Sequence, residues 1–381
     1  MTPICRRLIA ALFCAIAIAA VSAPGALAQS PPALSSAQQS YLALAESGVS
    51  QAEHAWRDHR LGWYDARLHD RNRYPLATIW DIVPLFQSID AIAIASPTPA
   101  HRRAVTSFAQ GAERYLNRGL HPVAGYSPYP GDREASAQTW FDDNGWWGLA
   151  FVNAYRATGA RLWLSDAQRA LGYIARAGWD PASGGIWWNT SHPYKSGPAL
   201  AADTLLATLL YQATGSSFDL AQARRFLSWA NTRGFSGADG LYAGSSINPT
   251  PVDYIEGPMI YAQATLCRLQ SSSSECALAD RLKQRAIVRF GHTLDFAPQY
   301  DAIYLQWMLA LYSLEGDSSL YRLAADNARS AEQRARNGRG LYLLSWNGEQ
   351  LSRNLAQPGM IQTQGATTSL FAWLAVYPPP S

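Results

Sequence analysis

Apolar residues recur at helical spacing along most of the chain, in twelve segments separated by polar, glycine-rich or aromatic stretches. Short runs typical of strands occur only in the stretches between them, as in Gly185-Ile186-Trp187-Trp188. The pattern therefore predicts an all-α fold. The expected helices cover residues 35–58, 76–95, 98–117, 142–157, 162–176, 198–213, 218–232, 254–270, 276–291, 299–314, 319–335 and 360–376.

An internal repeat relates several of these helices. The segments Tyr155–Gly159, Tyr211–Gly215 and Tyr312–Gly316 each end an apolar helix and precede a short polar turn. Their glycines lie 56 and 101 residues apart, close to one and two units of a period of ~50 residues. Glycine at this place commonly stops a helix in the left-handed conformation. The repeat predicts a series of helix pairs.

The connections between the helices alternate in length. Even-numbered helices leave through short turns, whereas odd-numbered helices leave through longer loops rich in aromatic residues and glycine. Those loops are residues 59–75, 118–141, 177–197, 233–253 and 336–359, with a shorter one at 292–298. The long loops must then gather at one end of the fold and lead into the even-numbered helices. These are also the more apolar helices, as in Trp146–Ala154 and Ala199–Leu210, which indicates that they are buried.

A closed (α/α)6 barrel of six inner and six outer helices fits this alternation, and an open helical solenoid is the alternative. In the barrel, six inner-helix N-termini converge at the loop-rich end. They would present N–H groups and positive dipole ends to a shared cleft.

The first 28 residues have the features of a signal peptide. Arg6 and Arg7 precede an apolar run over residues 8–20, and residues 26–28 form a small-residue cleavage site. The run is short for a membrane span. We expect cleavage to leave one domain over residues 29–381, exported to the periplasm or the extracellular space.

Charge and cysteine content narrow the possible partners. Without Arg6 and Arg7 the formal net charge falls from +3 to +1, which gives no basis for nucleic-acid binding or membrane insertion. A monomer is expected.

Cys267 and Cys276 flank a run of serines and should form a disulfide in an oxidising compartment. Metal ligation is the weaker interpretation because no histidine lies near them. The histidines show no metal-ligand spacing, so neither a metal nor a cofactor is expected.

Two adjacent carboxylates, Asp142 and Asp143, stand at the expected start of the fourth helix among large aromatic residues. The simplest interpretation is an N-cap followed by a carboxylate that matches the helix dipole. Glycoside hydrolysis, however, requires two carboxyl groups, one as proton donor and one as nucleophile or base. Neighbouring residues on a helix diverge by about 100°, so this spacing does not choose between retention and inversion. Helix N–H groups and aromatic burial should separate the two pKa values.

Other polar and aromatic residues lie near the expected starts of the inner helices. Flat apolar rings with hydrogen-bonding rims suit sugars, whose C–H faces stack on aromatic side chains. Each residue also has a structural interpretation: packing for the tryptophans, helix capping for Asp301, a surface charge for Lys195. The candidate substrate-binding residues are Trp80, Asp81, Trp146, Trp187, Trp188, Lys195, Tyr254, Glu256 and Asp301.

Several motifs occur in a familiar order: Phe141-Asp142-Asp143-Asn144-Gly145-Trp146-Trp147, Gly184-Gly185-Ile186-Trp187-Trp188-Asn189, Tyr194-Lys195 and Tyr254-Ile255-Glu256-Gly257. In these motifs the chain resembles glycoside hydrolase family 76, the endo-α-1,6-mannanases. The resemblance implies an (α/α)6 barrel and a retaining double displacement. It also implies that Asp142 is the nucleophile, that Asp143 is the acid/base, and that no metal takes part.

Two positions depart from the family pattern. Ser196-Gly197-Pro198 stands where an Asn is expected after the Tyr-Lys pair, and Ile255-Glu256-Gly257 stands where Asn-Gln-Gly is expected. Glu256 would then either alter a subsite or act as a third carboxylate. The sequence predicts an exported retaining glycosidase that cleaves internal α-1,6 linkages of α-mannan. The alternatives are a glycosidase of this fold with a different polysaccharide substrate and a non-catalytic glycan-binding protein.

Overall fold

Twelve α-helices dominate the part of the chain that the computed structural model describes, which comprises residues 33–69, 76–233, 235–271, 273–350 and 359–381. They lie within the unit Leu34–Ser381. The odd-numbered helices are α1 (Ser36–Trp56), α3 (Pro99–Ala112), α5 (Arg161–Tyr173), α7 (Ser217–Thr232), α9 (Ser273–Phe290) and α11 (Ser318–Arg334). The even-numbered helices are α2 (Ile79–Ala95), α4 (Phe141–Thr158), α6 (Gly197–Thr214), α8 (Asp253–Gln270), α10 (Pro298–Glu315) and α12 (Ile361–Val376).

The remaining regular structure in the described residues is short. Two antiparallel pairs join β1 (Arg57–Asp58) to β2 (Trp63–Tyr64) and β3 (Leu116–Asn117) to β4 (Gly125–Tyr126). The single-turn helices are η1 (Glu113–Tyr115), η2 (Ile174–Gly178) and η3 (Ala238–Gly240). The predicted signal peptide, residues 1–28, lies outside the described residues and stays a prediction.

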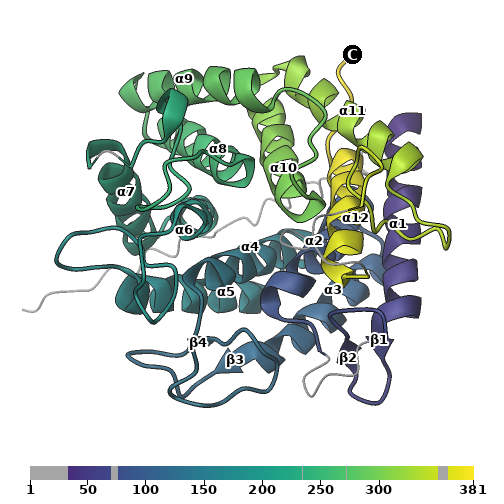
Figure 1. Ribbon diagram of the computed structural model, residues 1–381, viewed down its shortest axis with the longest axis horizontal. Coiled ribbons are helices and arrows are strands. Elements are labelled where there is room, and N and C mark those ends of the chain that lie inside the picture. The colour runs from purple at the N-terminus through teal and green to yellow at the C-terminus, as the bar shows by residue number, and fades with distance from the viewer. Residues whose placement is uncertain (1–32, 70–75, 234, 272, 351–358) are drawn as a thin grey trace, which may run out of the picture. The chain divides into compact units, whose positions relative to one another are not determined.

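The even-numbered helices form a closed inner ring, and the odd-numbered helices pack around it (Figure 1). Each inner helix contacts the next, from α2 through α4, α6, α8 and α10 to α12, and α12 in turn contacts α2. Burial agrees with this order: α12 is buried from Ile361 to Ala375, whereas α3 buries only Val105, Phe108, Ala109 and Ala112. The predicted (α/α)6 barrel is confirmed, and ring closure excludes the open solenoid.

Glycines end the inner helices as the repeat predicts. Gly159, Gly215 and Gly316 follow α4, α6 and α10 with φ of 75°, 70° and 80°. In each case the glycine N–H bonds to the carbonyl of the tyrosine four residues earlier. This left-handed conformation is easily adopted only by glycine, and it allows the chain to turn at once into the next outer helix.

Segments far apart in the sequence close the ring between α1 and α12. The Gln38 side-chain amide donates to the Ala375 carbonyl at 2.9 Å, and the Trp56 indole donates to the Gly359 carbonyl at 2.9 Å. A Cβ added to Gly48 would lie 2.3 Å from the Thr368 hydroxyl oxygen, so α1 approaches α12 as closely as its backbone permits. A side chain at position 48 would displace Thr368, so this close contact needs glycine.

Two outer helices end earlier than the apolar pattern predicts. The helix expected over 98–117 stops at Ala112, since the chain then turns through η1 and pairs β3 with β4. The helix expected over 162–176 stops at Tyr173 and widens into η2. In both places pairing or packing with the following loop replaces a regular helical turn, although the side-chain spacing continues. Among the described helices, none combines the length and the apolar composition that a membrane span requires.

Cys267 and Cys276 form a disulfide that joins the end of α8 to the start of α9, with a Cα–Cα distance of 5.0 Å. On the chain-entropy account, a loop of this length stabilises the fold by roughly 2–3 kcal/mol, because it restricts the unfolded chain. We therefore expect the double variant Cys267→Ala/Cys276→Ala to lose about 2–3 kcal/mol of unfolding free energy in guanidinium titrations. Wild-type protein under reductant should match the variant, and equal stability of oxidised protein and variant would contradict the prediction.

Candidate active site

A cleft of about 460 Å³ opens at the end of the barrel where the inner helices begin. Its walls come from the first turns of the inner helices and from the loops that lead into them. The lining residues are Thr78, Trp80, Pro128, Tyr129, Trp140, Asp142, Asp143, Trp188, Tyr194, Ser196, Pro198, Gly244, Ser245, Asn248, Val252, Tyr254 and Tyr300. The size and the mixture of aromatic and polar groups suit a small-molecule or sugar ligand.

Asp142 and Asp143 occupy the second and third positions of α4. The N-cap is Trp140, whose side chain makes no capping bond, so neither carboxylate is the predicted cap. The Asp142 carboxylate instead accepts the backbone N–H of Asp143 at 3.2 Å. The start of the helix is fixed by the neighbouring loop, because the Phe141 N–H donates to the Trp188 carbonyl at 3.0 Å. The pair is thus held in place by backbone contacts and faces the cleft.

The surroundings give the two carboxyl groups different proton affinities. Burial raises the pKa of Asp142 to about 7, and backbone N–H groups and the Trp188 indole act against that rise. Burial also raises the pKa of Asp143 well above its usual range, and the charges of Asp142 and Asp81 raise it further. Asp142 therefore loses its proton first, while Asp143 keeps one. A nucleophile and a proton donor require this difference.

Helix α6 brings a third acid behind the pair. A Cβ added to Gly145 would lie 2.2 Å from Asp203 Oδ1, so only glycine at this place lets the two helices meet. Both Asp203 oxygens are buried without a hydrogen-bond partner among the described residues. Burial, followed by the charge of Asp142, raises the pKa of Asp203 well above its usual range. Sequence analysis missed Asp203, although an acid inside the apolar run 199–210 was a detectable signal.

Aromatic side chains flank the carboxyl pair in two groups. Near α4, Trp188 stacks on Tyr194 with ring centroids 5.3 Å apart and meets Trp140 edge-on at 6.2 Å. The second group is Trp80 from α2, Tyr254 from α8 and Tyr300 from α10. Its centroid distances are 4.5 Å between the two tyrosines, 5.6 Å between Trp80 and Tyr300, and 6.5 Å between Trp80 and Tyr254.

The tyrosines of both groups are close enough to Asp142 to respond to its charge. Burial is the main cause of the raised pKa values of Tyr194, Tyr254 and Tyr300, and the Asp142 carboxylate raises each of them further. Their hydroxyls remain protonated donors at neutral pH. Tyr194 and Tyr300 were not among the predicted binding residues, although Tyr194 stands in one of the motifs.

The structure brings five predicted site residues together in the cleft: Trp80, Asp142, Asp143, Trp188 and Tyr254. Asp81 lies behind it, where its carboxylate accepts the Thr78 N–H at 2.9 Å and closes a capping box at the start of α2. Trp146 lies inside the barrel, beside a small internal cavity. Neither of these two residues lines the cleft.

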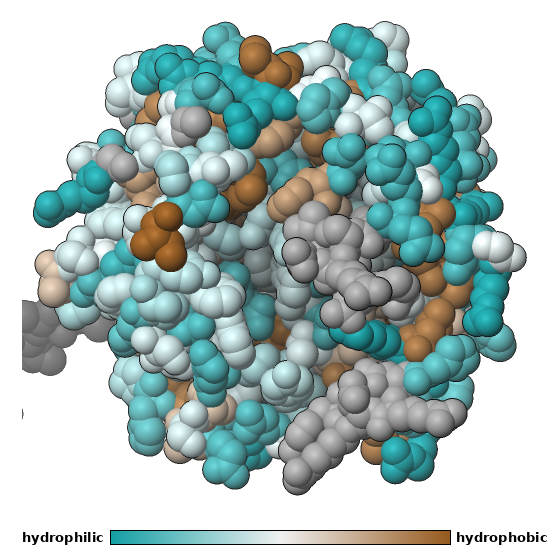
Figure 2. All heavy atoms as spheres, viewed as in Figure 1, coloured by the Kyte–Doolittle hydropathy of each residue, from teal (hydrophilic) through white to brown (hydrophobic). Residues whose placement is uncertain are grey.

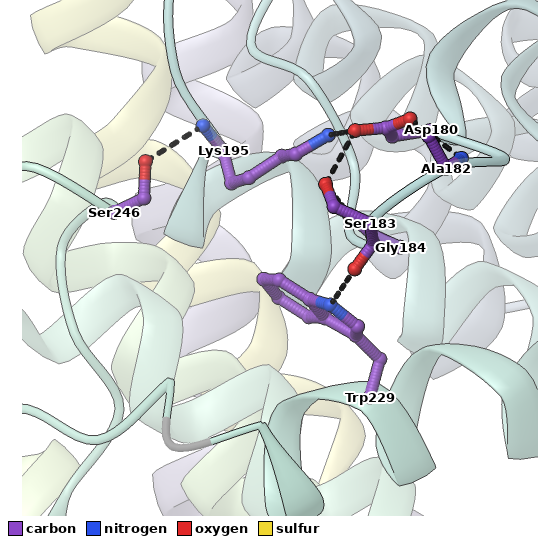
Figure 3. Close-up of polar contacts among 7 residues, drawn as sticks. All are labelled: Asp180, Ala182, Ser183, Gly184, Lys195, Trp229 and Ser246. Atoms are coloured by element: carbon purple, nitrogen blue, oxygen red, sulfur yellow. Dashed lines mark hydrogen bonds and ion pairs between the residues drawn. The ribbon is translucent and has the colours of Figure 1, made fainter.

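Lys195 and Trp187 belong to the loop beside the cleft, and Figure 3 shows the polar contacts of Lys195. The Lys195 ammonium donates to Asp180 at 2.6 Å and lies 3.1 Å from the centre of the Trp187 ring. Asp180 also accepts the Ser183 hydroxyl at 2.5 Å, and the Lys195 N–H donates to Ser246 at 3.0 Å. The bond from Lys195 holds the pKa of Asp180 well below its usual range. Neither Lys195 nor Trp187 lines the cleft, and both instead fix the loops that precede α6 and α8.

Glu256 and Asp301 are fully buried and do not line the cleft. Burial raises the pKa of Glu256 well above its usual range, and burial together with the charge of Asp253 does the same for Asp301. In both side chains, burial therefore favours the neutral acid over the carboxylate. Glu256 Oε1 accepts the backbone N–H of Tyr242 at 2.7 Å, which anchors the loop before α8.

The Glu256 contact is one of three equivalent anchors. The fourth residue of α4, α8 and α12 is polar, and its side-chain oxygen accepts the N–H of a tyrosine in the preceding loop. The pairs are Asn144 with Tyr126 at 2.9 Å, Glu256 with Tyr242 at 2.7 Å and Gln364 with Tyr342 at 2.8 Å. A polar residue four positions into an apolar helix was the sequence signal for these anchors. Within the described residues, no group of three or more His, Cys, Asp or Glu side chains could hold a metal ion.

Comparison with known proteins agrees with this geometry. The family model described as glycosyl hydrolase family 76 matches residues 114–284, which include the carboxyl pair and the loop of Trp187 and Trp188. No curated protein matches the sequence significantly. The matched segment is similar to the glycoside hydrolases of family 76, and it contains both aspartates of the cleft. The resemblance inferred from the motifs is thus confirmed.

Solved structures share the fold at low sequence identity. A family 76 glycoside hydrolase from a bovine Bacteroides thetaiotaomicron strain has a TM-score of 0.78 at 18% identity, over 88% of this chain and 78% of that one. An α-mannanase of the family from Bacteroides thetaiotaomicron has a TM-score of 0.77 at 18% identity, over 88% and 95%. The α-1,6-mannanase of Salegentibacter sp. HEL1_6 has a TM-score of 0.67 at 17% identity, over 88% and 99%.

The role of Glu256 as a loop anchor can be tested by substitution. Glu256→Gln keeps the acceptor oxygen and should retain glycosidase activity and stability. Glu256→Ala leaves the buried Tyr242 N–H without an acceptor and should cost about 1–3 kcal/mol of unfolding free energy. Both are checked by guanidinium titration together with kcat/KM. A large loss of kcat in Glu256→Gln, with stability unchanged, would instead indicate a third catalytic carboxylate.

Proposed function

We propose that the protein is an exported retaining glycoside hydrolase that cleaves internal α-1,6-mannosidic linkages. The observation that carries the proposal is the pair of adjacent carboxyl groups, partly buried at Asp142 and buried at Asp143, which have different proton affinities and lie between two groups of aromatic rings. Acid/base work on a sugar requires both parts: two carboxyl groups with separate roles, and flat apolar surfaces on which the sugar ring stacks.

The mechanism assigns one step to each carboxyl group. Asp142, the first to ionise, attacks the anomeric carbon and forms a covalent glycosyl-enzyme, while Asp143 gives its proton to the departing glycosidic oxygen. Asp143, now an anion, then removes a proton from water. The water oxygen attacks the anomeric carbon, the bond to Asp142 breaks, and both carboxyl groups return to their starting states with the configuration retained.

The comparisons support the choice of substrate. A variant of the Salegentibacter α-1,6-mannanase in which two adjacent aspartates are replaced by alanine is inactive, and its structure is a complex with α-1,6-mannotetrose. The corresponding asparagine variant is in complex with α-1,6-mannotriose. In this chain we assign the role of the two adjacent aspartates to Asp142 and Asp143. Export rests on the predicted signal peptide and would place the enzyme where it meets external polysaccharide.

Substitution of the pair tests the catalytic assignment. Asp143→Asn removes the proton donor and should lower kcat on α-1,6-mannan by roughly 10²- to 10⁴-fold. Asp142→Asn removes the nucleophile and should lower kcat at least as much. Glu134→Gln, an exposed acid in the loop before α4, is the matched control and should have wild-type activity. Reducing ends are measured, and NMR of the first product should show the α anomer. Near-wild-type turnover of either Asp variant would refute the assignment, and a β product would refute retention.

The pH dependence follows from the two raised pKa values. Asp142 must be ionised, so kcat/KM should fall as the pH drops below about 7. Asp143 must be protonated, so kcat/KM should also fall once the pH rises through its higher pKa. The Trp188 indole favours the Asp142 anion, and its removal in Trp188→Phe should therefore move the acid limb to higher pH. An acid limb that stays in place, or that moves to lower pH, would contradict this account.

A further inference from the structure

The aromatic group formed by Trp80, Tyr254 and Tyr300 continues beyond the cleft. Phe296, in the short connection between α9 and α10, lies 5.0 Å from Tyr300 between ring centroids, at an interplanar angle of 32°. Phe296 is 39% exposed, and it is not among the residues that line the cleft. Four adjacent rings therefore lead from the carboxyl pair to the surface.

A rigid connection holds Phe296 in this exposed position. Leu294 is buried, and its N–H donates to Asn327 Oδ1 on α11 at 2.7 Å. The Asn327 amide also donates to the His292 carbonyl at 3.2 Å. On the other side of Phe296, the Tyr300 N–H donates to the Ala297 carbonyl at 2.9 Å. The ring is thus presented to solvent by backbone that is tied down on both sides, which lowers the entropic cost of binding a ligand there.

Isolated apolar residues are common on protein surfaces and carry no meaning by themselves. On the face that Figure 2 shows, hydrophilic residues predominate and the apolar residues form small, separate patches. Phe296 differs from such residues in its contact with a ring of the cleft. Phe218, which is 43% exposed at the start of α7, follows the short turn after α6 and so lies at the opposite end of the barrel. Phe218 is therefore a control for Phe296, because it is similarly exposed but lies far from the cleft.

We propose that Phe296 is a remote subsite that stacks on a sugar unit outside the cleft and gives the enzyme a preference for long glycan chains. The inference rests on the proposed function and extends it to the substrate class, a polysaccharide in place of a short oligosaccharide. The ligand is a neutral sugar with an apolar C–H face, because the contact offered is an aromatic ring. A chain bound on the four rings passes beside the carboxyl pair and leaves the cleft over Phe296. This course suits cleavage at internal linkages.

The test compares Phe296→Ala with wild type on α-1,6-manno-oligosaccharides of increasing length and on the polymer. One stacking contact is worth about 0.5–1.5 kcal/mol, so the variant should lose roughly 2- to 12-fold in kcat/KM on the polymer, and the loss should diminish as the substrate shortens. Phe296→Trp keeps a flat ring and should retain the preference for long chains. Phe218→Ala should match wild type at every length.

Two results would overturn the inference. One is an equal loss for every substrate length, which would mean that Phe296 only supports Tyr300. The other is no loss on the polymer. Unfolding midpoints of the variants show whether a loss comes from instability. Wild-type protein that cleaves no α-1,6-mannan would instead refute the proposed function, whereas cleavage by wild type without a length-dependent effect in Phe296→Ala would refute this inference alone.

Discussion

Two adjacent carboxyl groups in the first turn of an inner helix, partly buried at Asp142 and buried at Asp143, are the costly feature on which the structure depends. Burial of ionisable groups is unfavourable, and a protein usually responds by keeping some of them neutral. Here the helix N–H groups favour the anion at Asp142, whereas burial, followed by the charge of Asp142, raises the pKa of Asp143. At Gly145, α6 packs directly against the helix that carries the pair. The barrel thus creates the low-polarity surroundings that separate the two roles.

The loops in front of the pair are fixed by the same inner helices. Three of these helices hold a preceding loop through a polar residue at their fourth position, and the ion pair of Lys195 with Asp180 holds another loop. The aromatic rings of the cleft bind a sugar well only if they are already held in position. Each side chain that must be ordered on binding reduces the affinity. The anchors therefore serve binding, although none of them touches the cleft.

The barrel and the carboxyl pair could be predicted from the sequence because both depend on order along the chain. Alternating connection lengths, and helices that are apolar on all sides, predicted which helices form the inner ring and which form the outer ring. The position of the carboxyl pair after a long loop predicted the end of the barrel at which the pair lies. The direction of each side chain was harder to predict. Tyr254 and Glu256 are two positions apart, which turns them about 200° around α8, so one faces the cleft and the other faces the loop behind it.

Neighbouring residues show the same effect in α10. Tyr300 lines the cleft, whereas Asp301, about 100° further around the helix, is buried behind it. Closeness in sequence to a helix start therefore identified the helices that contribute to the cleft. In several cases it selected a residue of such a helix that does not line the cleft. Cleft residues contributed by irregular loops, such as Asn248, have no periodic pattern from which they could be found. Only the path of the loop in the folded chain brings them to the site.

The contacts that close the ring of helices affect the order in which the protein folds. Gln38 bonds to a carbonyl 337 residues away, and Gln364 bonds to the Gly48 carbonyl 316 residues away. Contacts of such sequence separation form late, because the chain must lose much of its freedom before they can form. A partly synthesised chain that ends before α12 already contains both aspartates but has no closed ring around them. Activity should therefore arise in one late step of folding, and the unfinished barrel should be the form most exposed to proteases and to aggregation.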